Sequence, residues 1–206
     1  LSAAPVRRAL PTTEAIAAMR EAFAQLSSGQ VTLPVRQSLQ ATDARGDALV
    51  MPCHSAVQRM FSLKFVTTFP DNPRQGLPTI QSLVILTDGT TGAHLAVLDG
   101  ASLTAIRTGA ASGLATDLLA RPDAATVAVF GAGVQARTQV EAVCCVRTIR
   151  RASVYDPDAT AADRFAAEMT DRLGVQVERA DTPAQNLADA DVVCTATSSC
   201  KPVFAD

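Results

Sequence analysis

The chain has 206 residues, 48% of them hydrophobic, so it can bury a core in one large or two small domains. Its 18 basic and 20 acidic residues give a formal net charge of −2 without a basic run, which argues against nucleic acid or a membrane surface as a partner. No apolar run approaches the roughly 20 residues that a bilayer requires. The expected partners are small molecules or further copies of the chain.

In the first half of the chain a helical pattern gives way to strand patterns. A helix capped by Thr12 and ended by Gly29 is predicted, with a buried face formed by Ile16, Met19, Phe23 and Leu26. The segments DALVMP, MFSLKFV, TIQSLVIL and HLAVLDG then predict four strands, and TDGTTG predicts a hairpin connection between the last two. Consecutive strands without intervening helices indicate a largely antiparallel or mixed sheet.

The second half alternates between strands and helices. A helical pattern from Ala101 ends near Pro122, where we place the boundary between domains 1–121 and 122–206. Strands are predicted at 126–130, 152–155, 175–178 and 192–195, with helices to about 146, at about 161–173 and near 184. This alternation is typical of a parallel, doubly wound α/β sheet. No closing element follows the last strand, so we expect the chain to be incomplete at its C-terminus.

A glycine motif joins the first strand of the second domain to the next helix. Gly131, Gly133 and Ala136 form G-x-G-x-x-A. The first glycine permits a tight turn, the second lets the backbone approach a pyrophosphate, and the third position requires a small residue for packing. A glycine turn between packed elements is the alternative, but the strand before the motif and the helix after it favour dinucleotide binding.

The next strand ends in an acid, in the sequence ASVYD. Asp156 lies 25 residues after Gly131, close to the spacing of about 20 at which an acid accepts hydrogen bonds from the adenosine ribose. An ordinary turn or N-cap aspartate is the alternative. Because the carboxylate would repel a 2′-phosphate and no arginine follows immediately, we predict NAD as the cofactor, with NADP less favoured.

Three cations of the first domain could bind an anionic substrate. Lys64 in MFSLKFV, Arg107 in LTAIRTGAASG and Arg36 in LPVRQS have ordinary alternatives, an edge-strand or solvent charge for the lysine and surface arginines for the other two. Arginine can also bind a carboxylate through two parallel hydrogen bonds. Spacing alone does not show whether these side chains converge.

The cysteines and histidines indicate no metal or redox site. The cysteines are Cys53, Cys144, Cys145, Cys194 and Cys200. Because their number is odd and they form no CxxC pair, we predict reduced thiols in a cytoplasmic protein. His54 and His94 are isolated from any metal spacing or nucleophile triad. We therefore predict no metal, and we expect Cys144 and Cys145 to pack within a helix.

Several stretches together resemble the ornithine cyclodeaminase/mu-crystallin family. They are SLKFVTTFPDN, GLPTIQSLVILTDGTTG, LTAIRTGAASGLAT and VFGAGVQAR, in this order, and the resemblance covers essentially the whole chain. AIRTGAAS followed by GAGVQA is the specific combination. The resemblance implies an N-terminal α+β domain for substrate binding and dimerisation, followed by a Rossmann domain, in a homodimer.

The resemblance also assigns residue roles. It implies that Arg36, Lys64 and Arg107 hold the substrate carboxylate near Thr79, with Lys64 as the catalytic candidate. Thr108 would lie against the cofactor phosphates, and Asp156 would bind the adenosine ribose. The phosphate loop would comprise Gly131, Ala132, Gly133, Val134 and Gln135, and further cofactor contacts would come from Thr195, Ala196 and Thr197.

The implied chemistry is hydride transfer at the α carbon of an L-amino acid or its imine. It takes the form of ornithine cyclisation to proline with loss of ammonia, alanine dehydrogenation, or reduction of a cyclic imine. Leu49 and Val50 stand where family cyclodeaminases place a carboxylate, which counts against ornithine. The family's catalytic aspartate follows the fourth Rossmann strand, in a segment that this sequence lacks. A catalytically silent ligand-binding protein and an unrelated Rossmann regulatory module are the alternatives.

Overall fold

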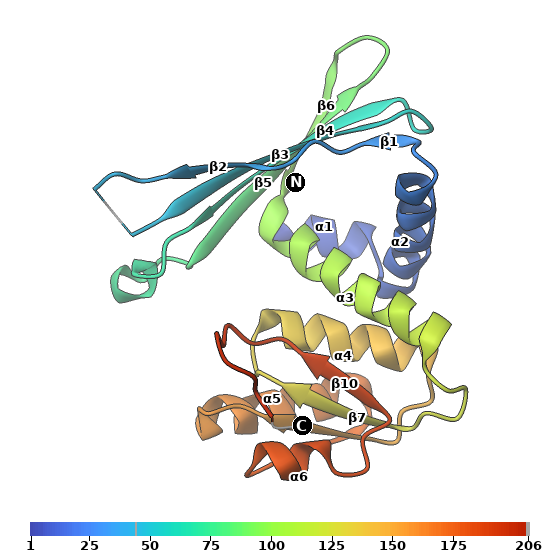
Figure 1. Cartoon of the computed structure of the whole chain (residues 1–206), viewed down its shortest axis with the longest axis vertical. Coiled ribbons are helices and arrows are strands. Elements are labelled where there is room, and N and C mark those ends of the chain that lie inside the picture. The colour runs from blue at the N-terminus through green and yellow to red at the C-terminus, as the bar shows by residue number, and fades with distance from the viewer. Residues whose placement is uncertain (44, 205–206) are drawn as a thin grey trace. The chain divides into compact units, whose positions relative to one another are not determined.

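The computed structural model describes residues 1–43 and 45–204, which form a mixed α/β structure of two compact units. The first unit comprises Leu1–Pro11 and Glu21–Thr104, and the second comprises Thr12–Arg20 and Ala105–Asp206. Figure 1 shows both units, with most of their helices and strands labelled. In the described part of the chain, no helix is both long and apolar enough to cross a membrane.

The first unit is built on an antiparallel sheet of order β1-β3-β4-β5-β6, in which β2 also pairs with β3. The four predicted strands are present, and β1, β2 and the helices α1 and η1 are additional. The bounds are α1 Ala3–Ala9, β1 Val31–Thr32, β2 Gln37–Gln40, β3 Asp47–Ser55, β4 Met60–Thr68, η1 Asn72–Gln75, β5 Ile80–Asp88 and β6 His94–Asp99. β1 has two residues and β2 is exposed throughout, so neither carries the apolar alternation that marks a strand.

The predicted hairpin connects β5 to β6. The Asp88 carboxylate accepts hydrogen bonds from the backbone N–H groups of Thr90 and Thr91 and from the Thr91 hydroxyl, at 2.7 to 2.9 Å. These bonds, led by that from the Thr91 backbone, lower the pKa of Asp88. The carboxylate thus closes the turn by binding its own loop.

The second unit contains a parallel sheet of order β10-β7-β8-β9 with the predicted alternation of strands and helices. Its elements are β7 Thr126–Phe130, α4 Val134–Val146, β8 Arg151–Tyr155, α5 Ala159–Leu173, β9 Gln176–Arg179, α6 Pro183–Leu187 and β10 Val192–Thr195. The sheet and the helices α4 and α5 enclose a core that includes fully buried Val129, Val140, Phe165 and Met169. Adjacent parallel strands bring their carboxyl ends to one edge of the sheet.

Helices α2 (Thr12–Ser27) and α3 (Gly100–Leu119) each contribute to both units. The compact units therefore divide α3 at Thr104, whereas the boundary predicted after residue 121 follows the end of that helix. Within the second unit, small residues let α3 approach α4 closely. A Cβ added at Gly109 would lie 2.4 Å from the Thr138 carbonyl oxygen, and one added at Gly113 would lie 2.9 Å from the Ala142 Cβ.

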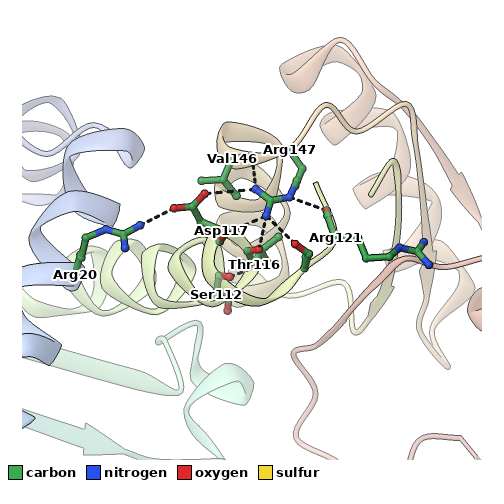
Figure 2. Close-up of polar contacts among 8 residues, drawn as sticks. Arg20, Ser112, Thr116, Asp117, Arg121, Val146 and Arg147 are labelled. Carbon is green, nitrogen blue, oxygen red and sulfur yellow. Dashed lines mark hydrogen bonds and ion pairs between the residues drawn. The ribbon is translucent and has the colours of Figure 1, made fainter. Parts of the chain in front are cut away.

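Arg147 ties the C-terminal end of α3 to the segment that follows α4 (Figure 2). Its guanidinium donates to the carbonyls of Thr116, Asp117, Ala120 and Arg121 at 2.9 to 3.1 Å. Asp117 also accepts from the Arg147 guanidinium at 3.4 Å and, through its other oxygen, from Arg20 at 2.5 Å. The arginine thereby adds a side-chain donor to the carbonyls at the end of α3, where Thr116 also accepts from the Ala120 N–H at 3.0 Å.

Two details of α2 differ from the sequence prediction. Pro11, not Thr12, occupies the N-cap position, because the Thr12 hydroxyl donates to the Glu141 carboxylate at 2.5 Å and makes no capping bond. Ile16 is buried as predicted, whereas Phe23 and Leu26 on the same stripe are exposed. Apolar spacing indicates which side chains share a helix face, but not which part of the face is covered.

Candidate functional site

The turn after β7 strongly favours glycine at its first position. Gly131 has φ +95°, a left-handed conformation, and a Cβ added there would lie 2.5 Å from the Ala196 carbonyl oxygen. The turn is held by backbone hydrogen bonds from Gly131 N–H to the Tyr155 carbonyl and from Ala196 N–H to the Phe130 carbonyl, both 2.8 Å. The ends of β7, β8 and β10 are thus connected around one glycine.

The second glycine has a different role. Gly133 has φ −86° and ψ −172°, which any residue can adopt, and a Cβ added there would meet nothing within 4 Å. Its neighbourhood is therefore open space, as a ligand approaching the backbone requires. Ala136 is fully buried, in agreement with the small residue that the motif requires for packing.

Asp156 lies at the end of β8 and binds the glycine loop. Its Oδ2 accepts a hydrogen bond from the Ala132 N–H at 2.8 Å, and its Oδ1 accepts one from the Asp158 N–H at 2.9 Å. Asp158 in turn caps α5 by accepting from the Ala161 N–H at 3.1 Å. Each carboxylate oxygen of Asp156 retains acceptor capacity beyond its single hydrogen bond.

A cavity of about 560 Å³ lies at this edge of the sheet. Six of the predicted cofactor residues line it, namely Gly131, Ala132, Gly133, Asp156, Ala196 and Thr197. Val134, Gln135, Thr195 and Thr108 do not, although Val134 and Gln135 form the first turn of α4 and Thr195 ends β10. Among the described residues of its wall, Asp156 is the one charged side chain.

Sequence reasoning had not identified the other residues that line the cavity. They are Phe130, Tyr155, Pro157, Pro183, Ser198, Ser199 and Val203. Phe130, Tyr155 and Pro157 flank the predicted residues directly, so proximity to the strand ends was an available signal. Pro183, at the start of α6, has no such signal, because its distance from the loop depends on how the chain folds.

The predicted substrate residues are placed as follows. Lys64 lies on β4, which is flanked by β3 and β5, so it is not on an edge strand. Its side chain is half-buried on the sheet face that also carries buried Val66 and Val84. Arg36 is exposed between β1 and β2, and Thr79 directly precedes β5, where its carbonyl accepts from the Phe69 N–H at 2.8 Å.

Arg107 and Thr108 lie on the part of α3 that belongs to the second unit. Arg107 is exposed as a whole residue, yet partial desolvation lowers the pKa of its guanidinium. Arginine remains charged despite such a shift. The two residues are therefore in the same compact unit as the glycine loop, whereas Lys64 is in the first unit.

The histidines and cysteines have other surroundings. His54 stacks on Phe61 with ring centroids 4.6 Å apart, and His94 Nδ1 lies 3.0 Å from the Thr87 hydroxyl. Burial raises the pKa of both the Cys144 and Cys194 thiols to about 11, so both are protonated at neutral pH. Cys144 packs against the core, whereas Cys145 is exposed.

The chain is similar over its whole length to known proteins. The model of the ornithine cyclodeaminase/mu-crystallin family matches residues 1–206. A Delta(1)-pyrroline-2-carboxylate reductase of Bacillus cereus is 35% identical over 206 residues, which is 100% of this chain and 63% of the relative. This chain thus spans less than two thirds of the length of that relative.

Solved structures give the same result. A Thermococcus litoralis Delta(1)-pyrroline-2-carboxylate reductase, in complex with NADH and L-proline, superposes with a TM-score of 0.94 at 37% identity, covering 99% of this chain and 63% of that one. An archaeal alanine dehydrogenase dimer with bound NAD has a TM-score of 0.90 at 35% identity, covering 98% of this chain and 61% of that one.

Proposed function

The chain belongs to the ornithine cyclodeaminase/mu-crystallin family, and we propose that it is part of an NAD-dependent oxidoreductase that transfers hydride at the α carbon of an L-amino acid or its imine. The observation that carries the proposal is the cavity in which an open glycine, Gly133, and an acid, Asp156, face the same space. The named relatives reduce an imino acid or dehydrogenate an amino acid.

The second unit is proposed to be a Rossmann-type dinucleotide-binding domain. The pyrophosphate would lie against the open backbone at Gly133, at the N-terminus of the 13-residue helix α4. Asp156 would accept hydrogen bonds from the adenosine ribose. A carboxylate with no lysine or arginine among the described lining residues disfavours a 2′-phosphate, which supports NAD over NADP.

The substrate carboxylate is proposed to be bound by Arg36, Lys64 and Arg107, with Thr79 nearby. Support for Lys64 comes from its half-buried position on a central strand, since a lysine there costs more to desolvate than one on an exposed edge. When bound, the nicotinamide supplies or accepts the hydride. The residues of this chain position the substrate and balance its charge.

An apolar substrate or a cyclic imine is favoured over ornithine. Leu49 and Val50 lie on β3, directly opposite Val66 and Phe65 of β4, so this stretch offers no carboxylate to a distal amine. The proposed activities are therefore imine reduction or alanine dehydrogenation, ahead of cyclodeamination.

A homodimer is proposed from the open face of the antiparallel sheet. Alternate residues of β4, β5 and β6 place apolar side chains there that remain 37–54% exposed: Phe61, Phe65, Leu83 and Val97. A contiguous apolar face of this kind is typical of an interface between subunits. The dimer of the related archaeal alanine dehydrogenase supports a second copy as the partner.

The test is a substrate panel with the full-length protein. Pyrroline-2-carboxylate and pyruvate plus ammonia are assayed with NADH, and alanine, lysine and ornithine with NAD⁺, with separate detection of proline and ammonia because cyclodeamination consumes no net cofactor. We expect turnover of an imine or of alanine. Lys64→Met should then raise KM or lower kcat by about tenfold or more, through loss of a charge-assisted contact. Binding of NADH without any turnover would favour the silent ligand-binding alternative.

A further inference from the structure

Arg137 ends the motif GAGVQAR and contacts the glycine loop. It lies on the first turns of α4, and its Nη1 donates to the carbonyl oxygens of Ala132 at 2.5 Å and of Gly133 at 3.0 Å. It does not line the cavity. The predicted roles of the motif concern the glycines and the small residue, and none of them requires an arginine at this position.

The two carbonyls fix the directions of two N–H groups. In a planar trans peptide, the C=O of one residue and the N–H of the next point in opposite directions. A carbonyl of Ala132 directed at Arg137 therefore directs the Gly133 N–H away from it, and the carbonyl of Gly133 does the same for the Val134 N–H. Because Asp156 binds the N–H of Ala132 at 2.8 Å, three consecutive peptide groups of the loop are held by side chains.

The guanidinium is itself fixed from the other side. Glu168 on α5 accepts a hydrogen bond from Nε at 2.9 Å and forms an ion pair with Nη2 at 2.8 Å, and the guanidinium lies 5.2 Å from the centre of the Phe165 ring. The Arg137 side chain is 22% exposed. The hydrogen bond from Arg137 lowers the pKa of Glu168, so the pair is ionised at neutral pH. Arg137 is thus a cation held in place by α5, and the carbonyls of the glycine loop point toward it.

We propose that Arg137 is a positioning residue that orients the N–H groups of Gly133 and Val134 toward a diphosphate. This inference rests on the proposed function, since it names the device that prepares the same cofactor site. A cation bound to a carbonyl also polarises that peptide and makes its N–H a stronger donor. The arginine acts through the loop and makes no contact with the ligand.

The experiment separates binding of the diphosphate from binding of the nucleoside. Calorimetric dissociation constants for adenosine, ADP and NADH are measured on the full-length protein and on Arg137→Met. We expect the preference for ADP over adenosine to fall about tenfold or more, with the affinity for adenosine within about twofold of its original value. Glu168→Gln, which loosens the arginine but keeps its charge, should lower the same preference by a smaller factor.

Arg172→Met is the matched control. Arg172 on α5 pairs with Glu141 on α4, and in the described part of the chain its hydrogen bond and ion pair go to that residue and not to the glycine loop. The variant therefore also removes one arginine–glutamate bridge between the two helices. We expect its preference for ADP over adenosine to be unchanged. Thermal unfolding of both variants shows whether each remains folded at the titration temperature.

An unchanged preference for ADP over adenosine in Arg137→Met would overturn the inference while leaving the proposed function intact. The preference is unchanged if both affinities are retained, and also if both fall by the same factor, as a merely structural role would produce. Failure of the unsubstituted protein to bind either ADP or NADH would instead overturn the proposed cofactor site, and the inference with it.

Discussion

The two glycines of the loop should respond to alanine in opposite ways. Gly131→Ala places a side chain at φ +95°, which costs roughly 1–2 kcal/mol, and places a Cβ 2.5 Å from a backbone carbonyl, which costs roughly 1–3 kcal/mol if Ala196 moves. Alanine also makes the unfolded chain less flexible, which offsets roughly 0.4–1 kcal/mol of this loss of stability. The net loss of stability is therefore about 1–5 kcal/mol, or a fall in Tm of about 2–20 °C.

Gly133→Ala should leave stability almost unchanged. Its backbone already has a conformation that alanine adopts, and nothing lies within 4 Å of the added Cβ. In the proposed complex the same Cβ would occupy the space through which a pyrophosphate approaches, and a misfit of roughly 1–3 kcal/mol corresponds to a loss of affinity of about 5- to 150-fold. One variant should thus lose stability, and the other should lose cofactor binding.

Differential scanning calorimetry and NADH titration of both variants test this division. Gly131→Ala is expected to unfold at a lower temperature, and Gly133→Ala is expected to keep its Tm and bind NADH weakly. An unchanged Tm in Gly131→Ala would refute the steric reasoning at the turn. An NADH dissociation constant within about twofold of the original in Gly133→Ala would remove that glycine from the phosphate site.

Three further predictions concern charge. Asp156→Ser should narrow the preference for NADH over NADPH because the repulsive carboxylate is removed, and an unchanged ratio of kcat/KM values would contradict its proposed role. Arg147→Met should lower stability in urea unfolding by about 2–4 kcal/mol, because several carbonyls at the end of α3 lose a side-chain donor, whereas exposed Arg150→Met should not. Burial raises the pKa of Cys144 and Cys194 to about 11, so the unfolded chain ionises first as pH rises above about 9. Stability should then fall between about pH 9 and 11, by up to about 1.4 kcal/mol per pH unit for each thiol, and replacing both cysteines with alanine should flatten this dependence.

Local sequence patterns predict most of the structure of the second unit. Its four strands and its helices are separated by short connections, and the alternation alone predicted that they form a parallel sheet, as the structure confirms. The sequence also predicts that the glycines and Asp156 lie close together, because parallel strands bring their carboxyl ends to one edge of the sheet whatever the loops contain. The Arg137 contact could not be predicted from the sequence, because its acceptors are backbone carbonyls, which every residue has.

The first unit shows what periodicity leaves open. The alternation in MFSLKFV places Lys64 on the other face of the strand from the phenylalanines. A lysine on an edge strand and a lysine on a central strand, however, have the same local pattern. Strand order distinguishes them, and it depends on the pairing of β4 with both β3 and β5, which the pattern within β4 does not specify. Thr12 is a similar case, since its hydroxyl binds Glu141, 129 residues away, in place of its own helix.

The packing of α3 bears on how the proposed substrate and cofactor groups are related. Arg107 and Thr108 directly precede Gly109, whose close approach to Thr138 of α4 leaves no room for a side chain. Helix α4 begins at the glycine loop, so α3 residues at this contact are held at a fixed distance from that loop. Interdigitated helices resist sliding because any shift creates clashes or voids. The Arg107 guanidinium is thus positioned by the same helix pair that positions the loop, which would let a bound substrate carboxylate and a bound cofactor share one rigid support.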